Sequence, residues 1–153
     1  MRFICSVEID LPVAKVIELF DNVDNIKEWQ DGFVSYEHLS GTPGEPGATS
    51  RLVYQTEGGE IELIETIVVK NLPEEFIGTY EAKSMVNTMR NSFTSLGENK
   101  TRYDTEIEYT AFYGFIPKMM AFLMPGLFRK QTQKWLNQFK VFAEKEAMNT
   151  QTA

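Results

Sequence analysis

Cysteine and histidine are almost missing from the sequence, because Cys5 and His38 are the only residues of their kinds among 153. A single cysteine excludes an intramolecular disulfide, and the two residues together are too few for a Cys/His zinc site, so we expect no metal. No run of about 18 apolar residues is present, which predicts no integral membrane segment. The N-terminal segment contains an acidic residue, Glu8, before an apolar stretch long enough for a signal peptide. We therefore expect a cytoplasmic protein.

Positive charge is also scarce, since 15 basic residues face 22 acidic ones and the net charge is −7. Nucleic-acid binders carry a basic footprint, so we expect no nucleic-acid partner. Residues 117–147 are the exception, with six basic and two acidic residues. A basic amphipathic helix there could contact an anionic membrane or an acidic partner. We favour the alternative, a solvated outer helix face balanced against an acidic sheet.

The length and composition fit one globular domain. Hydrophobic residues make up 42% of the chain and charged residues 24%, which is too apolar for disorder. No repeat or linker divides the sequence. We expect one domain over residues 1–147 and a loose tail over residues 148–153, in a monomer or a homodimer.

Different segments of the chain show the two-residue hydrophobic period of strands or the 3.6-residue period of helices. Residues 2–10 alternate apolar and polar side chains, which predicts a half-exposed strand, and two short helices follow, the second ending near Trp29. Short Gly- and Pro-rich breaks then divide six segments that we expect to be antiparallel strands. These segments lie near 33–40, 48–57, 60–70, 75–82, 85–96 and 101–113.

The C-terminal segment predicts a long helix that covers the sheet. Its apolar stripe consists of Phe128, Thr132, Trp135, Phe139 and Phe142, spaced 4, 3, 4 and 3 residues apart. The apolar faces are all buried if a curved antiparallel seven-stranded sheet wraps around this helix. The predicted fold class is therefore α+β.

This order of elements resembles the helix-grip fold of the START-domain and polyketide-cyclase (SRPBCC) superfamily over residues 2–146. Residues 9–16, Trp29, residues 50–54 and residues 136–142 carry the local resemblance. The resemblance implies a cavity for a hydrophobic small molecule between sheet and helix. A minority of the members of this superfamily are cyclases or other enzymes, so the resemblance is also compatible with an enzyme.

Three functions follow from this resemblance. The first, which we favour, is binding of a lipid, polyketide or aromatic-like molecule without a cofactor. The second is a cyclase/dehydratase-like lyase or isomerase acting in the same cavity. The third is a protein-interaction or stress-response module of the same fold, which a filled interior and a large exposed apolar patch would favour.

The alternation of the last strand, extended to its neighbours, predicts which side chains line the cavity, although one bulge would reverse the parity of a strand. The predicted ligand-binding residues are Leu52, Tyr54, Ile67, Phe76, Tyr80, Met85, Asn87, Met89, Asn91, Phe93, Tyr109, Tyr113, Met119, Met120, Leu123 and Trp135.

Asn87 and Asn91 interrupt an otherwise apolar face of one predicted strand. A buried amide without partners costs about 1–3 kcal/mol, so these residues would be polar handles for a ligand or a water molecule. The alternation is imperfect on both faces. The alternative is that the opposite face, with Val86, Thr88 and Arg90, is the inner one.

The enzyme alternative would use Glu65, Tyr54, Arg90 or Tyr109 as acid and base groups. Burial of Glu65 would raise its pKa, as a general acid requires. We favour instead a bulge that turns Glu65 to water. For Arg90 we favour an ion pair with carboxylates of neighbouring strands.

Overall fold

The structure is a computed structural model that describes residues 1–152. Its first strand, β1 (Arg2–Ile9), ends before Pro12 and leads into two short helices, α1 (Val13–Phe20) and α2 (Ile26–Trp29). A single 3₁₀ turn, η1 (Val23–Asn25), separates them. The predicted strand and pair of helices are therefore confirmed.

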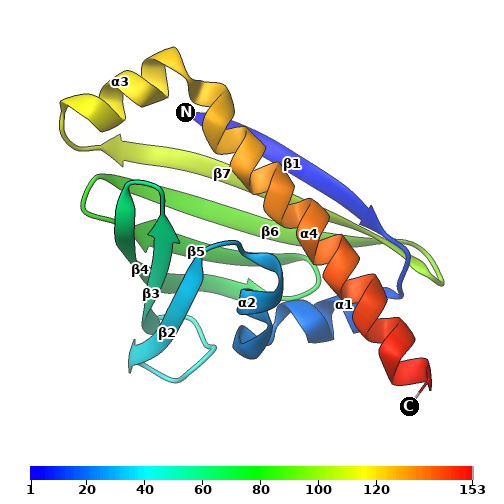
Figure 1. Ribbon diagram of the computed structural model, residues 1–153. Coiled ribbons are helices and arrows are strands. Elements are labelled where there is room, and N and C mark those ends of the chain that lie inside the picture. The colour runs from blue at the N-terminus through cyan, green and yellow to red at the C-terminus, as the bar shows by residue number, and fades with distance from the viewer. Residues whose placement is uncertain (153) are drawn as a thin grey trace.

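Six strands and two helices follow, and the predicted α+β helix-grip architecture is confirmed (Figure 1). Every neighbouring pair of strands is antiparallel, in the sheet order β1-β7-β6-β5-β4-β3-β2. The elements are β2 (Phe33–Ser40), β3 (Thr49–Thr56), β4 (Gly59–Asn71), β5 (Glu75–Glu81), β6 (Met85–Gly97), β7 (Lys100–Phe112), α3 (Phe115–Leu123) and α4 (Pro125–Thr152).

Helix α4 crosses one face of the sheet and packs most closely on β1 (Figure 1). It begins at Pro125, a residue that suits the first turn of a helix because it has no N–H to leave unpaired. On its covered side Thr132, Leu136 and Phe139 are buried. No helix within the described residues is long and apolar enough to cross a membrane.

The solid core is an aromatic cluster between α1, α2 and the C-terminal half of α4. Phe20 is its hub, with its ring centroid 4.9 Å from that of Phe93 and 5.7 Å from that of Tyr103. The Trp29 ring lies 5.1 Å from the ring of Phe139, which is fully buried. The two short helices therefore fill one end of the space between sheet and α4.

The C-terminal end differs from the prediction. Helix α4 continues through Met148 to Thr152, where the sequence suggested a loose tail. This stretch contains neither proline nor glycine, so nothing in it breaks the helical hydrogen-bond pattern.

We expect Phe139→Ala to destabilise the protein by about 3–5 kcal/mol, because it leaves a cavity among the aromatic rings. Urea unfolding followed by circular dichroism measures this change. Val141→Ala is the matched control on the same helix, since Val141 is 66% exposed, and its effect should stay within about 0.5 kcal/mol. Equal effects of the two substitutions would contradict this account of the core.

Candidate functional site

A cavity of about 720 Å³ lies between the sheet and the N-terminal half of α4. Its walls come from β2 to β7, from α1, η1 and α2, and from the junction of α3 with α4, where Leu127 and Phe128 line it. Along α4, the buried core begins at Leu136 and includes Phe139. Phe20 of α1 and Trp29 of α2 line one end of the cavity, and beyond them the space between the sheet and α4 remains hollow.

Strand β6 presents its odd-numbered residues to this cavity, which confirms the predicted parity. Asn87 and Asn91 are buried, and Arg90 on the opposite face is exposed. The strand register places Tyr80 beside Asn87 and Phe76 beside Asn91. The predicted residues that line the cavity are Leu52, Tyr54, Ile67, Phe76, Tyr80, Met85, Asn87, Met89, Asn91, Tyr109, Met120 and Trp135.

Four predicted lining residues lie elsewhere. Phe93 belongs to the aromatic core, with its ring stacked 4.6 Å from that of Tyr103. Tyr113 is 54% exposed, because the register between β6 and β7 shifts next to Tyr109 and reverses the parity beyond it. Met119 and Leu123 are exposed on the outer side of α3.

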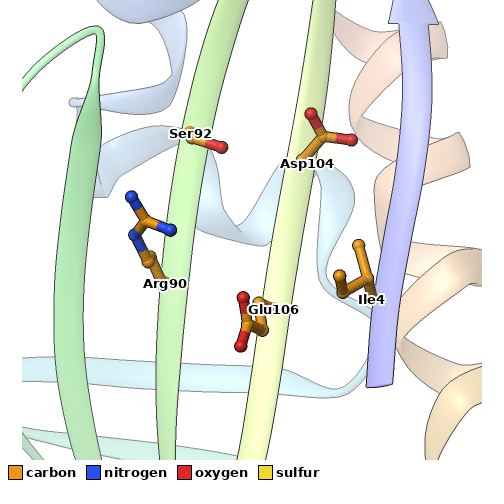
Figure 2. Close-up of a pocket in the computed structure, with 5 residues that line it drawn as sticks. All are labelled: Ile4, Arg90, Ser92, Asp104 and Glu106. Atoms are coloured by element: carbon orange, nitrogen blue, oxygen red, sulfur yellow. The ribbon is translucent and has the colours of Figure 1, made fainter. Parts of the chain in front are cut away.

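Arg90 lies on the outer face of the sheet, so its assignment as a cavity acid or base was wrong. It lines a depression of about 310 Å³ together with Ile4, Ser92, Asp104 and Glu106, and Figure 2 shows these five side chains on neighbouring strands. Its Nε atom lies 2.9 Å from a carboxylate oxygen of Glu75. The favoured alternative, an ion pair with a strand carboxylate, is therefore confirmed.

Glu65 points into the cavity, which corrects the expectation that a bulge turns it to water. Strands β3 and β4 pair without interruption from Thr49 opposite Thr66 to Thr56 opposite Gly59, so the alternation of β4 is preserved there. The Tyr80 hydroxyl donates a hydrogen bond of 2.8 Å to the Glu65 carboxylate.

Gly78 makes room for the Tyr80 ring that forms this bond. A Cβ atom on Gly78 would lie 2.9 Å from the Tyr80 hydroxyl oxygen and 3.1 Å from two ring carbons. Such separations are shorter than van der Waals contact, so any side chain at this position would displace the ring. The absence of a side chain therefore lets Tyr80 fold back over its own strand toward Glu65.

Two further polar pairs border the cavity. The Tyr54 hydroxyl donates to Oε1 of Gln30 at 2.5 Å, and the Tyr103 hydroxyl donates to Oδ1 of Asn91 at 2.8 Å. Gln30 was not predicted, because it follows the last residue of α2 and no periodic pattern marks it. The adjacent Trp29 is the signal that could have found it, since a buried aromatic residue fixes the position of α2 against the core.

Burial sets the protonation of these groups. Desolvation raises the pKa of Glu65, and the hydrogen bond from Tyr80 offsets part of that rise. Desolvation likewise raises the pKa of Tyr109 to about 12, and it raises the pKa values of Tyr54 and Tyr80. The phenols are therefore neutral hydrogen-bond groups at physiological pH.

Some other polar atoms at the cavity wall have no hydrogen-bond partner among the described residues. Among the described residues, the side-chain amide of Asn87 forms no hydrogen bond, although Asn87 is only 9% exposed. The buried indole N–H of Trp135 also has no partner in this part of the chain. Lys70 is the cation at the wall, and it pairs with Asp21 at 3.1 Å.

Within residues 1–152, no group of three or more His, Cys, Asp or Glu residues is arranged to hold a metal ion.

The sequence matches no known family model and no curated protein, whereas its structure resembles many solved ones. Zhui aromatase/cyclase from Streptomyces sp. R1128 aligns with a TM-score of 0.80 at 12% identity, over 96% of this chain and 95% of that one. The protein TTHA0849 from Thermus thermophilus gives 0.77 at 16%, over 95% and 99%. A START superfamily protein from Mycobacterium smegmatis gives 0.63 at 15%, over 90% and 97%. At these identities the likenesses show the helix-grip fold alone.

We expect Glu65→Gln to change how stability depends on pH. Because the fold raises the pKa of Glu65, the folded protein holds this proton more tightly than the unfolded chain. Wild-type stability should therefore fall as pH rises from the ordinary glutamate pKa through the raised one, and E65Q should lack this loss. Urea unfolding of both proteins from acidic to neutral pH measures the difference.

The matched control is Glu60→Gln, which removes an exposed carboxyl from the same strand. It should follow the wild-type pH dependence. A stability difference between wild type and E65Q that stays constant with pH would show that Glu65 is not held in a desolvated site.

Proposed function

We propose that the protein binds a hydrophobic small molecule, a lipid, polyketide or aromatic-like compound, in the cavity between the sheet and α4. The observation that carries this proposal is the cavity itself, with a volume of about 720 Å³ and mainly apolar walls. This volume lies in the range of sites that hold drug-sized ligands. Burial of apolar area would supply the affinity, at about 25 cal/mol per Å² before ordering costs.

The polar groups at the wall favour a ligand with a neutral hydroxyl or carbonyl group. The Asn87 amide offers both a donor and an acceptor, and Glu65 with Tyr80 offers a second polar position. An anionic group would meet the carboxyl of Glu65, while Lys70 is already paired with Asp21. The cavity therefore favours ring-bearing or lipid-like molecules without a free carboxylate or phosphate inside.

A second candidate, a cyclase/dehydratase-like lyase or isomerase, is favoured by the Glu65–Tyr80 pair. A desolvated carboxyl with a raised pKa beside a phenol can deliver and accept a proton in a water-poor pocket. Tyr54, whose hydroxyl already donates to Gln30, and Tyr109 are the other acid/base candidates at the wall. The fold is shared with an aromatase/cyclase, but at 12% identity it carries no reaction over to this chain.

We expect Met89→Trp to abolish most ligand binding while the protein stays folded. Met89 lies on the inner face of β6 opposite Gly78, so an indole there would occupy the cavity instead of clashing with a packed core. The dissociation constant of any compound that binds should rise at least about ten-fold, because the ligand loses apolar contact area. Isothermal titration calorimetry measures it, and Thr94→Trp, an exposed position on the same strand, should leave it unchanged.

Native mass spectrometry of protein purified from its host, followed by extraction, identifies the class of any bound molecule. We expect co-purified hydrophobic ligand in wild type and much less in M89W. Ligand-free protein in every preparation, with no thermal shift from a panel of lipids and polyketides, would contradict the binding proposal.

The enzyme candidate predicts a bell-shaped pH–rate profile for conversion of a bound molecule, and loss of its acid-side or base-side limb in E65Q. Liquid chromatography of the ligand before and after incubation measures conversion. Recovery of the ligand unchanged with wild type would exclude this candidate in favour of binding alone.

A further inference from the structure

Helix α3 turns its apolar side chains toward water, the reverse of the usual arrangement in a globular protein. None of its residues is buried, and Phe122 and Phe115 are 84% and 78% exposed. Figure 1 shows α3 projecting at the end of the molecule, with α4 as its main contact. Five of its six exposed large apolar residues recur at i, i+1, i+4, i+7 and i+8 and so share one helix face, with Met120 as the sixth: Phe115, Ile116, Met119, Phe122 and Leu123.

Unpaired positive charge flanks this apolar face. Between Glu108 and Glu144 the chain contains no acidic residue. Lys118 lies on α3 itself, and Arg129 and Lys130 lie in the second turn of α4; all three are exposed. Within the described part of the chain, none of these three forms an ion pair, although the chain as a whole is acidic.

We propose that α3 and the first two turns of α4 dock on an anionic lipid surface. The apolar face of α3 would enter the boundary between headgroups and acyl chains, and the flanking lysine and arginine side chains would contact lipid phosphates. A short helix with exposed phenylalanine and leucine on one face and basic residues beside it is complementary to an anionic membrane surface in both polarity and charge. The remainder of the acidic chain would stay away from the membrane.

Charge complementarity selects the lipid surface over a second copy of the chain. A two-fold dimer through α3 is self-complementary, so it would bring Lys118, Arg129 and Lys130 of both copies together. Like charges at such an interface repel one another, and residues 109–143 supply no carboxylate to neutralise them. An anionic membrane instead attracts all three.

The docked face lies next to the cavity. Met120 of α3 and Leu127 and Phe128 of α4 line the cavity, and Met120 and Leu127 are also partly exposed beside Met119 and Leu123. Docking would therefore hold this end of the cavity against the lipid. The docking proposal does not require a ligand, because its test uses vesicles alone.

Co-sedimentation with extruded vesicles tests the proposal. The full chain is mixed with vesicles of phosphatidylcholine alone, or of phosphatidylcholine and phosphatidylglycerol in equal parts. We expect binding to the anionic vesicles that weakens as sodium chloride is added. The F115S/F122S variant should bind at least about ten-fold more weakly, because two phenyl rings no longer enter the lipid.

The charge contribution has its own variant and control. K118Q/K130Q should weaken binding about five-fold for each charge removed. K27Q/K145Q removes two lysines from α2 and the C-terminal half of α4, away from α3, and should bind like wild type. Val68→Ser, at an exposed apolar position on β4, is the matched control for the phenylalanine substitutions. Circular dichroism verifies that each variant is folded.

Three results would overturn the proposal. The first is wild-type protein that fails to sediment with anionic vesicles, and the second is F115S/F122S binding that equals the wild type. The third is sedimentation velocity showing a wild-type dimer that F115S/F122S dissociates, without vesicle binding, which would assign the face to a second copy. Binding of M89W to vesicles at the wild-type level would support docking even if the cavity proposal fails.

Discussion

The structure depends on a geometric mismatch: a strongly bent antiparallel sheet and a straight helix cannot touch along their whole length. Around Phe139 the mismatch is filled, because α1 and α2 insert Phe20 and Trp29 between the layers. Toward the N-terminus of α4 nothing is inserted, and the cavity results. One arrangement of elements thus produces both the stabilising core and the candidate binding site.

The polar groups at the cavity wall are tolerated because most have internal partners. Tyr80 donates to Glu65, and Tyr103 donates to Asn91, so burial does not leave these oxygens unsatisfied. The Asn87 amide has no such partner among the described residues. A group of this kind adds little to folding and is available for a ligand, which is why the binding proposal places the polar part of the ligand there.

The sequence predicted the architecture well because two strong periodicities carried it, the alternation of the strands and the 3.6-residue stripe of α4. The same alternation identified the inner face of β6, including Asn87 and Asn91. It failed at Tyr113, where a register shift that depends on the pairing of two strands reversed the parity. For Glu65 the alternation was sound, and the expected bulge that would turn it to water was the error, because β3 and β4 pair continuously there. The outward face of α3 has no signature in periodicity, which identifies a stripe but not the side it faces.

Part of the cavity wall lies outside the aromatic core, which has a consequence for how such a chain diversifies. Residues such as Met89 and Leu52 can be exchanged for others of different shape without disturbing the rings around Phe139 that secure folding. Ligand preference can therefore change at these positions, whereas Phe20, Trp29 and Tyr103 belong to both the core and the cavity wall. A backbone of this kind is compatible with very different sequences, since Zhui aromatase/cyclase has the same fold at 12% identity.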